Sequence, residues 1–264
     1  MKSINDFKKA KQNLNKISMV TCYDAWSASI IEKSNIDCVL VGDSLAMVVY
    51  GHDSTLHADI KMMFSHTAAV RRKSTKFIIA DMPFLSTHKG IENAMNAVQE
   101  LMKAGANAVK IEGIDGQEDV IKAIVQAGVP VMGHIGLTPQ SIHQMGGYKI
   151  QGKTDKDSQK IKDDALKLQA LGCFSLVMEC VPTQLGAEVS ELLNIPTIGI
   201  GAGPFCDGQV LVLQDLLGAQ SEINPRFVRR YQDVSESWSQ TLNKFDKDIK
   251  AVEFPNKDES YLWQ

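Results

Sequence analysis

The chain repeats one pattern along its length: a short apolar run, a polar or glycine-containing loop, and a longer amphipathic stretch. Most of the apolar runs are nearly continuous rather than alternating, which is typical of parallel strands covered on both faces. The predicted strands are residues 19–23, 38–42, 77–81, 108–112, 129–134, 175–180, 195–200 and 210–213. The last of these runs can equally begin a helix.

The stretches between the runs predict helices. Residues 92–104, 117–126 and 157–171 have helical spacing, and each is followed by a glycine in the position where helices commonly end: Gly105, Gly128 and Gly172. Strands alternating with helices in a chain of 264 residues predict an α/β fold, a single-domain (β/α)₈ TIM barrel over residues 1–264. An open doubly wound sheet is the alternative, but no G-x-G-x-x-G turn follows the first run. We expect a polar N-terminal segment and a helical C-terminal tail.

Composition excludes several classes of function. The formal net charge of −3 and a pI near 6.1 provide no basic surface for a nucleic-acid backbone. No apolar run approaches the roughly 20 residues that span a bilayer, and the lysine-rich start has no secretory apolar region. The five cysteines form no C-x-x-C pair, which argues against a disulfide framework and a structural zinc site. We expect a reducing, cytoplasmic compartment, with no membrane and no nucleic acid as partner.

Ionisable residues stand at the ends of the central predicted strands. In a parallel barrel these ends meet at one mouth, where barrel enzymes place their active sites. The residues in question are Asp43, Asp81, Lys110, Glu112, His134 and Glu179. So many ionisable groups at one mouth repel or desolvate each other unless a partner compensates them, and a bound divalent cation is the simplest such partner.

The donor types indicate which cation and which chemistry. The oxygen donors Asp43, Asp81 and Glu112 favour Mg²⁺ over zinc. A small 2-keto acid offers two oxygens to such an ion, which can polarise the carbonyl and stabilise the enolate formed on loss of the C3 proton. Lys110, which shares a strand face with Glu112, can hold the substrate carboxylate or enolate oxygen, and Glu179 is our choice for the proton acceptor.

Each residue also has a simpler interpretation. An aspartate at a strand end, such as Asp43 or Asp81, is often only a helix N-cap. Glu112 and Lys110 can form an ordinary surface ion pair, His134 can bond a backbone carbonyl, and Glu179 can belong to a structural network. Five strands with such a residue at the same end are harder to explain by caps. The prediction of a site therefore depends on the constellation and not on any one member.

Three glycine-rich or long segments follow predicted strand ends. The connections at residues 43–75 and 135–154 are longer than usual, and loops at this end of a barrel are candidate lids. The stretch Gly-Ile-Gly-Ala-Gly-Pro at residues 199–204 can bind phosphate or can simply permit tight turns.

Nine motifs together resemble one family. They are Met19-Val-Thr-Cys-Tyr-Asp24, Leu40-Val-Gly-Asp-Ser44, Tyr50-Gly-His-Asp-Ser-Thr55, His66-Thr-Ala-Ala-Val-Arg-Arg72, Ala106-Asn-Ala-Val-Lys-Ile-Glu-Gly113, Gly133-His-Ile-Gly-Leu-Thr-Pro-Gln140, Gly146-Gly-Tyr-Lys149, Leu176-Val-Met-Glu-Cys-Val-Pro182 and Ile198-Gly-Ile-Gly-Ala-Gly203. Their order and content resemble the ketopantoate (3-methyl-2-oxobutanoate) hydroxymethyltransferases of pantothenate and coenzyme A biosynthesis, over roughly residues 19–218.

The resemblance carries expectations about activity and assembly. It implies a barrel of the phosphoenolpyruvate/pyruvate type, often a homodecamer. It implies transfer of a hydroxymethyl group from the co-substrate 5,10-methylenetetrahydrofolate to 3-methyl-2-oxobutanoate, giving 2-dehydropantoate.

The resemblance also assigns roles to residues. It implies Mg²⁺ at Asp43 and Asp81, which also meet the substrate, and Glu112 as a further acid of the metal site, acting directly or through water. It implies Ser44 and Lys110 as substrate-binding residues and Glu179 as proton acceptor. His134 matches a site histidine near the substrate.

The departures are modest and leave two competing functions. Met82 stands where the family has leucine, and Gly203-Pro-Phe-Cys-Asp-Gly208 differs from the usual Gly-Asn start, which affects the expected folate contacts. The tail from Phe254 resembles the family least. A Mg²⁺-dependent carbon–carbon lyase or mutase of the same barrel superfamily is one alternative, and a catalytically silent scaffold is the other.

Overall fold

The structure is a computed structural model that describes residues 1–220, 225–261 and 263. It divides into two compact units, residues 1–212 and 213–264. The second unit contains α10 (Leu213–Leu216), α11 (Val234–Lys250) and a short 3₁₀ helix, η3 (Lys257–Glu259). Along α11, apolar side chains recur every three or four residues at Trp238, Leu242, Phe245 and Ile249, which is the spacing of one helix face.

The first unit is a closed barrel of parallel strands in sequence order, so the barrel prediction is confirmed. Its strands are β1 (Ile17–Thr21), β2 (Cys38–Val41), β3 (Phe77–Asp81), β4 (Ala108–Glu112), β5 (Val131–Gly136), β6 (Ser175–Glu179), β7 (Thr197–Ile200) and β8 (Gly208–Leu211). The predicted ranges of β3 and β4 are those observed, and the others differ by one to two residues at one or both ends. The eighth run proved to be a strand, which pairs with β1 and β7.

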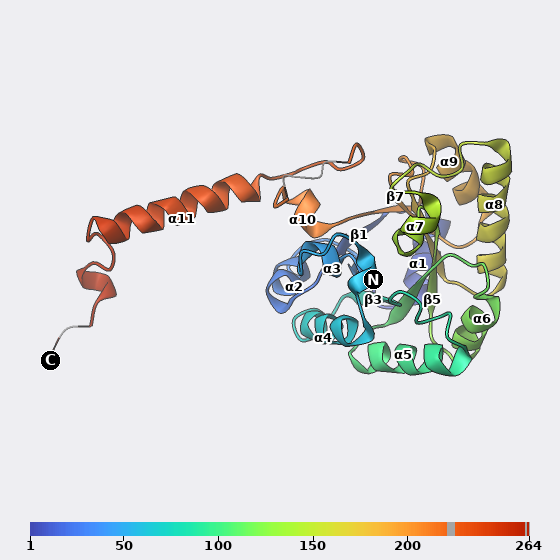
Figure 1. The fold of residues 1–264 in the computed structure, drawn as a ribbon, viewed down its shortest axis with the longest axis horizontal. Coiled ribbons are helices and arrows are strands. Elements are labelled where there is room, and N and C mark those ends of the chain that lie inside the picture. Colours follow the sequence, from blue (N-terminus) through green and yellow to red (C-terminus); the bar gives the residue numbers. More distant parts are fainter. Residues whose placement is uncertain (221–224, 262, 264) are drawn as a thin grey trace. The chain divides into compact units, whose positions relative to one another are not determined.

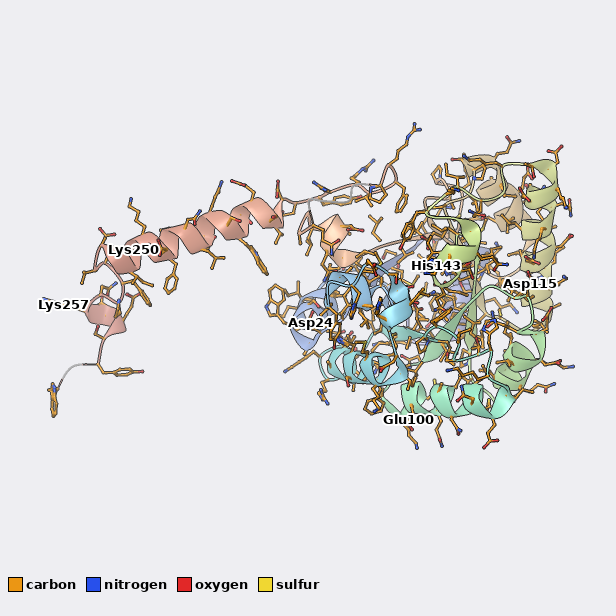
Figure 2. All side chains as sticks on the ribbon, in the orientation of Figure 1. Asp24, Glu100, Asp115, His143, Lys250 and Lys257 are labelled. Atoms are coloured by element: carbon orange, nitrogen blue, oxygen red, sulfur yellow. The ribbon has the colours of Figure 1, made fainter. Side chains whose placement is uncertain are left out.

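Helices surround the strands. They are α1 (Ile4–Gln12), α2 (Ala25–Glu32), α3 (Leu45–Val48), α4 (Ile60–Arg71), α5 (Ile91–Lys103), α6 (Glu118–Gln126), α7 (Ile142–Met145), α8 (Asp155–Ala170) and α9 (Thr183–Leu192), with 3₁₀ turns η1 (Thr55–His57) and η2 (Pro139–Ser141). The larger helices α2, α4, α5, α6, α8 and α9 form the outer ring (Figure 1). Charged side chains such as Glu100 on α5 and Asp115 before α6 lie on its outer surface (Figure 2).

Local sequence explains where the helices begin and end. Asp24 and Asp59 cap α2 and α4 by accepting hydrogen bonds from the backbone N–H groups of Ser27 and Met62. The three glycines predicted to follow α5, α6 and α8 all have positive φ, which suits a residue without a Cβ. No helix among the described residues is long and apolar enough to cross a membrane, and all five cysteines are free thiols.

The barrel interior changes from apolar to polar along its axis. Every strand contributes at least one apolar side chain to the buried core inside the barrel, including Met19, Leu40, Ile79, Ala108, Met132, Val177, Ile198 and Val210. Residues two positions further along a strand face the same side. On four neighbouring strands that position is ionisable, namely Asp81, Lys110, His134 and Glu179. On these strands the site residues therefore follow the apolar core residues, toward the carboxyl ends of the strands.

The amino end of the barrel is closed by α1. Phe7 is fully buried and its ring meets Phe77 and Phe174 edge-on, at centroid distances of 5.2 and 5.1 Å. These three rings fill the end of the barrel opposite the ionisable residues. The rings bury apolar surface at this end of the barrel.

Replacement of Phe7 by alanine should therefore destabilise the barrel without altering the chemistry of the mouth. We expect Phe7→Ala to lower the free energy of unfolding by about 3–5 kcal/mol, because it removes a buried ring and leaves a cavity. Chemical denaturation followed by circular dichroism measures this value. Phe205→Ala is the matched control, because Phe205 is 60% exposed and should change stability by about 0.5 kcal/mol or less. Equal losses in the two variants would contradict the role assigned to α1.

Candidate active site at the carboxyl end of the barrel

Three carboxylates gather at the mouth. Asp43 follows β2, Asp81 ends β3 and Glu112 ends β4. Each offers one oxygen, and these oxygens all lie within 4.8 Å of one another. Their side chains are almost fully buried. The structure therefore brings these three residues together, as the sequence predicted. These three residues form the carboxylate cluster.

Lys110 lies between the carboxylates. Its Nζ is 3.2 Å from Asp81 Oδ1 and 3.3 Å from Glu112 Oε1, and it is 4% exposed. The register of β3 and β4 pairs Asp81 with Lys110, which brings their side chains to the same height in the barrel. Burial would lower the pKa of Lys110, but the surrounding carboxylates more than offset this and raise it. Lys110 therefore remains a cation across the physiological range.

His134 joins the cluster to Glu179. Its Nδ1 is 3.2 Å from Lys110 Nζ and 3.4 Å from Glu112 Oε1, and its Nε2 is 3.3 Å from Glu179 Oε2. Burial and Lys110 lower the pKa of His134, but Glu112 and Glu179 outweigh them and raise it to about 9. The contact between Nε2 and Glu179 is an ion pair without hydrogen-bond geometry, and Nε2 forms no hydrogen bond with the described residues.

Glu179 differs from the other carboxylates. It stands outside the carboxylate cluster, and its side chain is 17% exposed, against 4% or less for those of Asp81 and Glu112. The register of β5 and β6 pairs Glu179 with Gly136. A Cβ at Gly136 would come within 2.2 Å of the Glu179 carbonyl oxygen, so a residue without a side chain is required there. This glycine lets β5 pack closely against the backbone of Glu179.

Ser44 sits at the start of α3, beside the cluster. Its Oγ is 2.8 Å from the hydroxyl of Tyr23, a fully buried tyrosine at the end of β1. Gly42 leaves room for this hydroxyl, because a Cβ there would lie 2.8 Å from Ser44 Oγ. All six predicted site residues and Ser44 are thus found around one mouth.

The mouth of the barrel contains more acidic than basic side chains. Burial first, and then the charges of Glu112 and Asp81, raise the pKa of Asp43. Burial also raises the pKa of Asp81, although Lys110 opposes this. Glu112 is the exception, because Lys110 and His134 overcome the effect of burial and lower its pKa to about 2. Four carboxylates thus face one lysine and one histidine.

The donor set fits a hard divalent cation. Asp81 Oδ1 is buried and accepts no hydrogen bond from the described residues, since its contact with Lys110 is an ion pair without hydrogen-bond geometry. An oxygen left in this state, in a cluster made only of oxygen donors, is what Mg²⁺ binds. Among the described residues, no other group of His, Cys, Asp or Glu offers three such ligand atoms together.

Sequence reasoning missed three residues of the mouth as parts of the site. Gln140 donates hydrogen bonds to Asp43 and Met82, Tyr23 contacts Ser44, and Tyr148 reaches over the mouth to donate to Met47 Sδ at 3.7 Å. All three lie inside quoted motifs. Their types, an amide and two tyrosines, carry no charge to single them out, and only the fold shows what they contact.

The glycine stretch after β7 shows a backbone requirement. Gly201 and Gly203 both have positive φ, and a Cβ at Gly203 would lie 2.5 Å from Thr183. Tight turns and close packing thus account for these two glycines.

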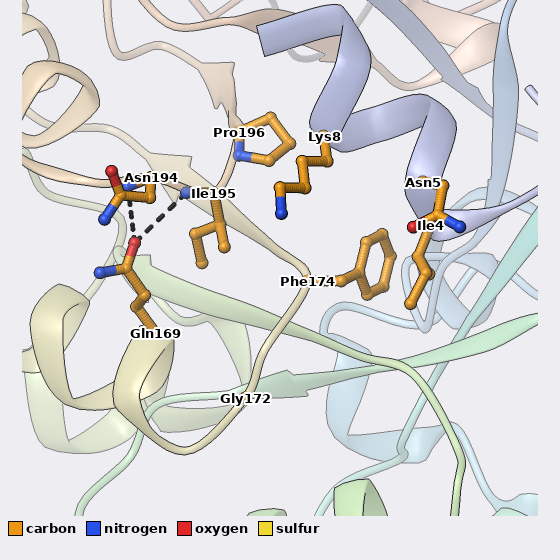
Figure 3. Close-up of a pocket in the computed structure, with 9 residues that line it drawn as sticks. All are labelled: Ile4, Asn5, Lys8, Gln169, Gly172, Phe174, Asn194, Ile195 and Pro196. Atoms are coloured by element: carbon orange, nitrogen blue, oxygen red, sulfur yellow. Dashed lines mark hydrogen bonds between the residues drawn. The ribbon is translucent and has the colours of Figure 1, made fainter. Parts of the chain in front are cut away.

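A separate cleft of about 400 Å³ lies at the opposite end of the barrel. It is lined by α1 and by the segments that lead into β6 and β7, and Figure 3 shows Gln169 accepting hydrogen bonds from the backbone of Asn194 and Ile195. Its lining contains no carboxylate. The cleft is therefore not the site of the chemistry predicted here.

Comparison with known proteins decides the family. Residues 1–257 match the family described as ketopantoate hydroxymethyltransferase. The chain belongs to this family. The 3-methyl-2-oxobutanoate hydroxymethyltransferase of Bdellovibrio bacteriovorus is 52% identical over 99% of this chain and 100% of its own length. The enzyme of the same name from Francisella tularensis subsp. novicida is 48% identical, with 99% of each chain covered.

Solved structures agree on the fold. A phosphonopyruvate hydrolase crystallised with oxalate and Mg²⁺ has a TM-score of 0.63 at 10% identity, covering 98% of this chain and 93% of its own. A 2,3-dimethylmalate lyase of the PEP mutase/isocitrate lyase superfamily has a TM-score of 0.61 at 14% identity, with 99% and 92% covered. These likenesses show the fold of the barrel alone. Because the chain belongs to this family, it is a hydroxymethyltransferase and therefore an enzyme. This excludes the two alternative functions, a lyase or mutase and a catalytically silent scaffold.

The raised pKa values of Asp43 and Asp81 predict how Mg²⁺ binding depends on pH. Without a cation, a carboxyl whose folded pKa is raised favours folding at low pH, and this contribution is lost as the pH rises through that pKa. Mg²⁺ competes with these protons and should compensate the charge once they leave. We expect added Mg²⁺ to raise the melting temperature more at about pH 8 than at about pH 5.

Thermal unfolding with and without Mg²⁺ at both pH values measures this difference. Asp81→Asn is the control, because it removes one cluster charge with little change in shape, and it should abolish most of the Mg²⁺ effect. The same Mg²⁺ stabilisation at both pH values, or in Asp81→Asn, would place the cation elsewhere.

Proposed function

We propose that this enzyme converts 3-methyl-2-oxobutanoate to 2-dehydropantoate, with 5,10-methylenetetrahydrofolate as one-carbon donor. Overall, the C3–H bond of the keto acid is replaced by a bond to the methylene carbon. The bonds from that carbon to the folate nitrogens break, water supplies the hydroxyl oxygen, and tetrahydrofolate is released. Family membership supports the acceptor and product, since relatives of about 50% identity carry this activity in their names.

The carboxylate cluster would hold Mg²⁺ through Asp43, Asp81 and Glu112. When bound, this ion supplies Lewis-acid chemistry, drawing electron density from the keto group so that the C3 proton is more easily lost. The three residues themselves provide the negative charge that attracts the ion into a buried mouth. The unbonded Oδ1 of Asp81 is the structural feature that supports this role.

Lys110 and Ser44 would hold the keto acid. Lys110 is a permanent cation in a nearly dry environment, so it attracts a carboxylate or a developing enolate oxygen strongly. The Ser44 hydroxyl can donate a hydrogen bond to the substrate carboxylate while its oxygen accepts one from Tyr23. Asp43 and Asp81 would also border the bound keto acid, and His134 would lie beneath it.

Glu179 would remove the C3 proton, and its position is the observation that carries the proposal. It is the carboxylate at the mouth that stands outside the cluster, and it keeps partial exposure while its neighbours are buried. A carboxylate that holds a cation is a poor base, because the ion competes for its electron pair. Glu179 instead lies 3.3 Å from His134 Nε2, in an ion pair that lacks hydrogen-bond geometry.

Substitution separates the role of the base from that of the cluster. Glu179→Gln keeps the shape and removes the base, so we expect turnover to fall by at least about a hundredfold while binding of Mg²⁺ and keto acid stays nearly unchanged. Asp81→Ala should instead weaken metal-dependent binding of the keto acid. Steady-state kinetics and calorimetric binding measure the two effects. Equal losses of binding in both variants would contradict these separate roles.

Proton exchange tests the proposed reaction most directly. Proton NMR of 3-methyl-2-oxobutanoate in D₂O, with protein and Mg²⁺, should show loss of the C3 proton signal, because enolisation exchanges that proton for deuterium. Addition of tetrahydrofolate and formaldehyde should then give 2-dehydropantoate. Glu179→Gln is the matched control and should leave the C3 signal in place. Neither exchange nor product from folded wild-type protein would reject the substrate assignment.

We also propose a cytoplasmic enzyme that acts as a homo-oligomer, a decamer by family resemblance. The five free thiols support a reducing compartment. The apolar face of α11, with residues 238, 242, 245 and 249 in register, supports association with another chain.

A further inference from the structure

Gln140 connects the ends of three strands, although it belongs to the loop after a fourth. Its side-chain Nε2 donates to Asp43 Oδ2 at 2.8 Å and to the carbonyl oxygen of Met82 at 2.9 Å. Its backbone N–H donates to Glu112 Oε2 at 3.0 Å. Asp43 follows β2, Met82 follows β3 and Glu112 ends β4, while Gln140 itself comes after β5. One residue thus contacts two of the three members of the carboxylate cluster.

The orientation of this amide is fixed by chemistry. A carboxylate and a carbonyl oxygen can only accept hydrogen bonds, so the amide nitrogen, and not the oxygen, must face both of them. Both N–H groups of the side chain are then used. Rotation of the Asp43 carboxylate would break the bond at Oδ2, and withdrawal of the loop would break the bond to Glu112. Gln140 therefore restricts the cluster at two of its three corners.

We infer that Gln140 is a positioning residue that sets the carboxylate cluster for its divalent cation. Gln140 is not itself a ligand; it acts through Asp43 and Glu112. The inference rests on the metal role given to the cluster under the proposed function. Groups that orient metal ligands typically change metal affinity by about 10- to 100-fold when they are removed. Amide donors suit this purpose because they fix a carboxylate without adding charge that would compete with the ion.

The same residue links the cation to the loop that overhangs the mouth. Beyond Gln140 the chain reaches Tyr148, whose hydroxyl donates to Met47 Sδ, and the backbone N–H of Gln151 donates to the carbonyl oxygen of Cys180, next to Glu179. The loop is thus bonded to the site at both ends. Because coupling between two binding equilibria is reciprocal, a cation that orders the cluster should also hold this loop in place.

A pair of glutamine variants tests the inference. Gln140→Met keeps the length of the side chain and removes both side-chain donors, while the backbone bond to Glu112 remains. Calorimetric titration with Mg²⁺ alone should show a dissociation constant raised about 10- to 100-fold. Gln144→Met is the matched control, since Gln144 is exposed and only four residues away in the same loop, and its dissociation constant should equal that of the wild type.

Kinetics and proteolysis distinguish positioning from simple support of the fold. In Gln140→Met the Mg²⁺ concentration for half-maximal turnover should rise by the same factor, while kcat at saturating Mg²⁺ recovers, because the base and substrate-binding groups are intact. Trypsin cleavage after Lys149 should be slowed by Mg²⁺ in the wild type and in Gln144→Met but not in Gln140→Met. A purely structural glutamine would lower the melting temperature without moving the Mg²⁺ dissociation constant, and this outcome would overturn the inference.

A second variant covers the case in which Gln140→Met does not fold. Gln140→Asn keeps the amide but is one methylene shorter, so it cannot reach both acceptors, and it too should weaken Mg²⁺ binding. An unchanged affinity in Gln140→Asn would also overturn the inference. The titrations need neither keto acid nor folate. If the wild-type protein binds Mg²⁺ but shows no turnover, only the proposed reaction is contradicted. If turnover is normal and the variants bind Mg²⁺ with unchanged affinity, only the role of Gln140 is contradicted.

Discussion

The buried ammonium group of Lys110 is the interaction on which the mouth of the barrel depends. Burial of several carboxylates in one place is unfavourable, because each loses hydration and repels the others. Lys110 contacts Asp81 and Glu112 at 3.2 and 3.3 Å and so offsets part of this cost within the chain. It does not offset all of it, as the raised pKa values of Asp43 and Asp81 indicate. The remaining imbalance is the physical basis for the cation site proposed at this cluster.

The apolar layer beneath the mouth makes such an imbalance tolerable. Apolar side chains from all eight strands form a buried core inside the barrel, and the rings around Phe7 close its amino end. Stability therefore comes from burial over the lower part of the barrel, while the upper part carries the charges. This division is visible in the sequence of β3, β4, β5 and β6. On each of these strands an inward apolar residue is followed two positions later by an ionisable one.

Much of the barrel follows from the sequence because parallel buried strands are continuous apolar runs. The boundaries were less predictable: β1 begins at Ile17 and β5 extends to Gly136, since ladder hydrogen bonds and not hydrophobicity end a strand. The ionisable site residues could be recognised because strand ends converge in any closed parallel barrel. Gln140 could not, because its importance comes from hydrogen bonds across three strand ends that depend on how its loop folds back.

His134 lies between the carboxylate cluster and Glu179, to which cation binding and proton transfer are assigned in the proposed function. Lys110 Nζ lies 3.2 Å from Nδ1, and Nε2 lies 3.3 Å from Glu179 Oε2 in an ion pair without hydrogen-bond geometry. A movement of Glu112 on cation binding would reach Glu179 through this ring, because Nδ1 is 3.4 Å from Glu112 Oε1. Gln140 holds Glu112 from the opposite side through its backbone N–H. Glu179 is thus connected to the carboxylate cluster through His134, so the proposed cation site and the proposed base share one set of contacts.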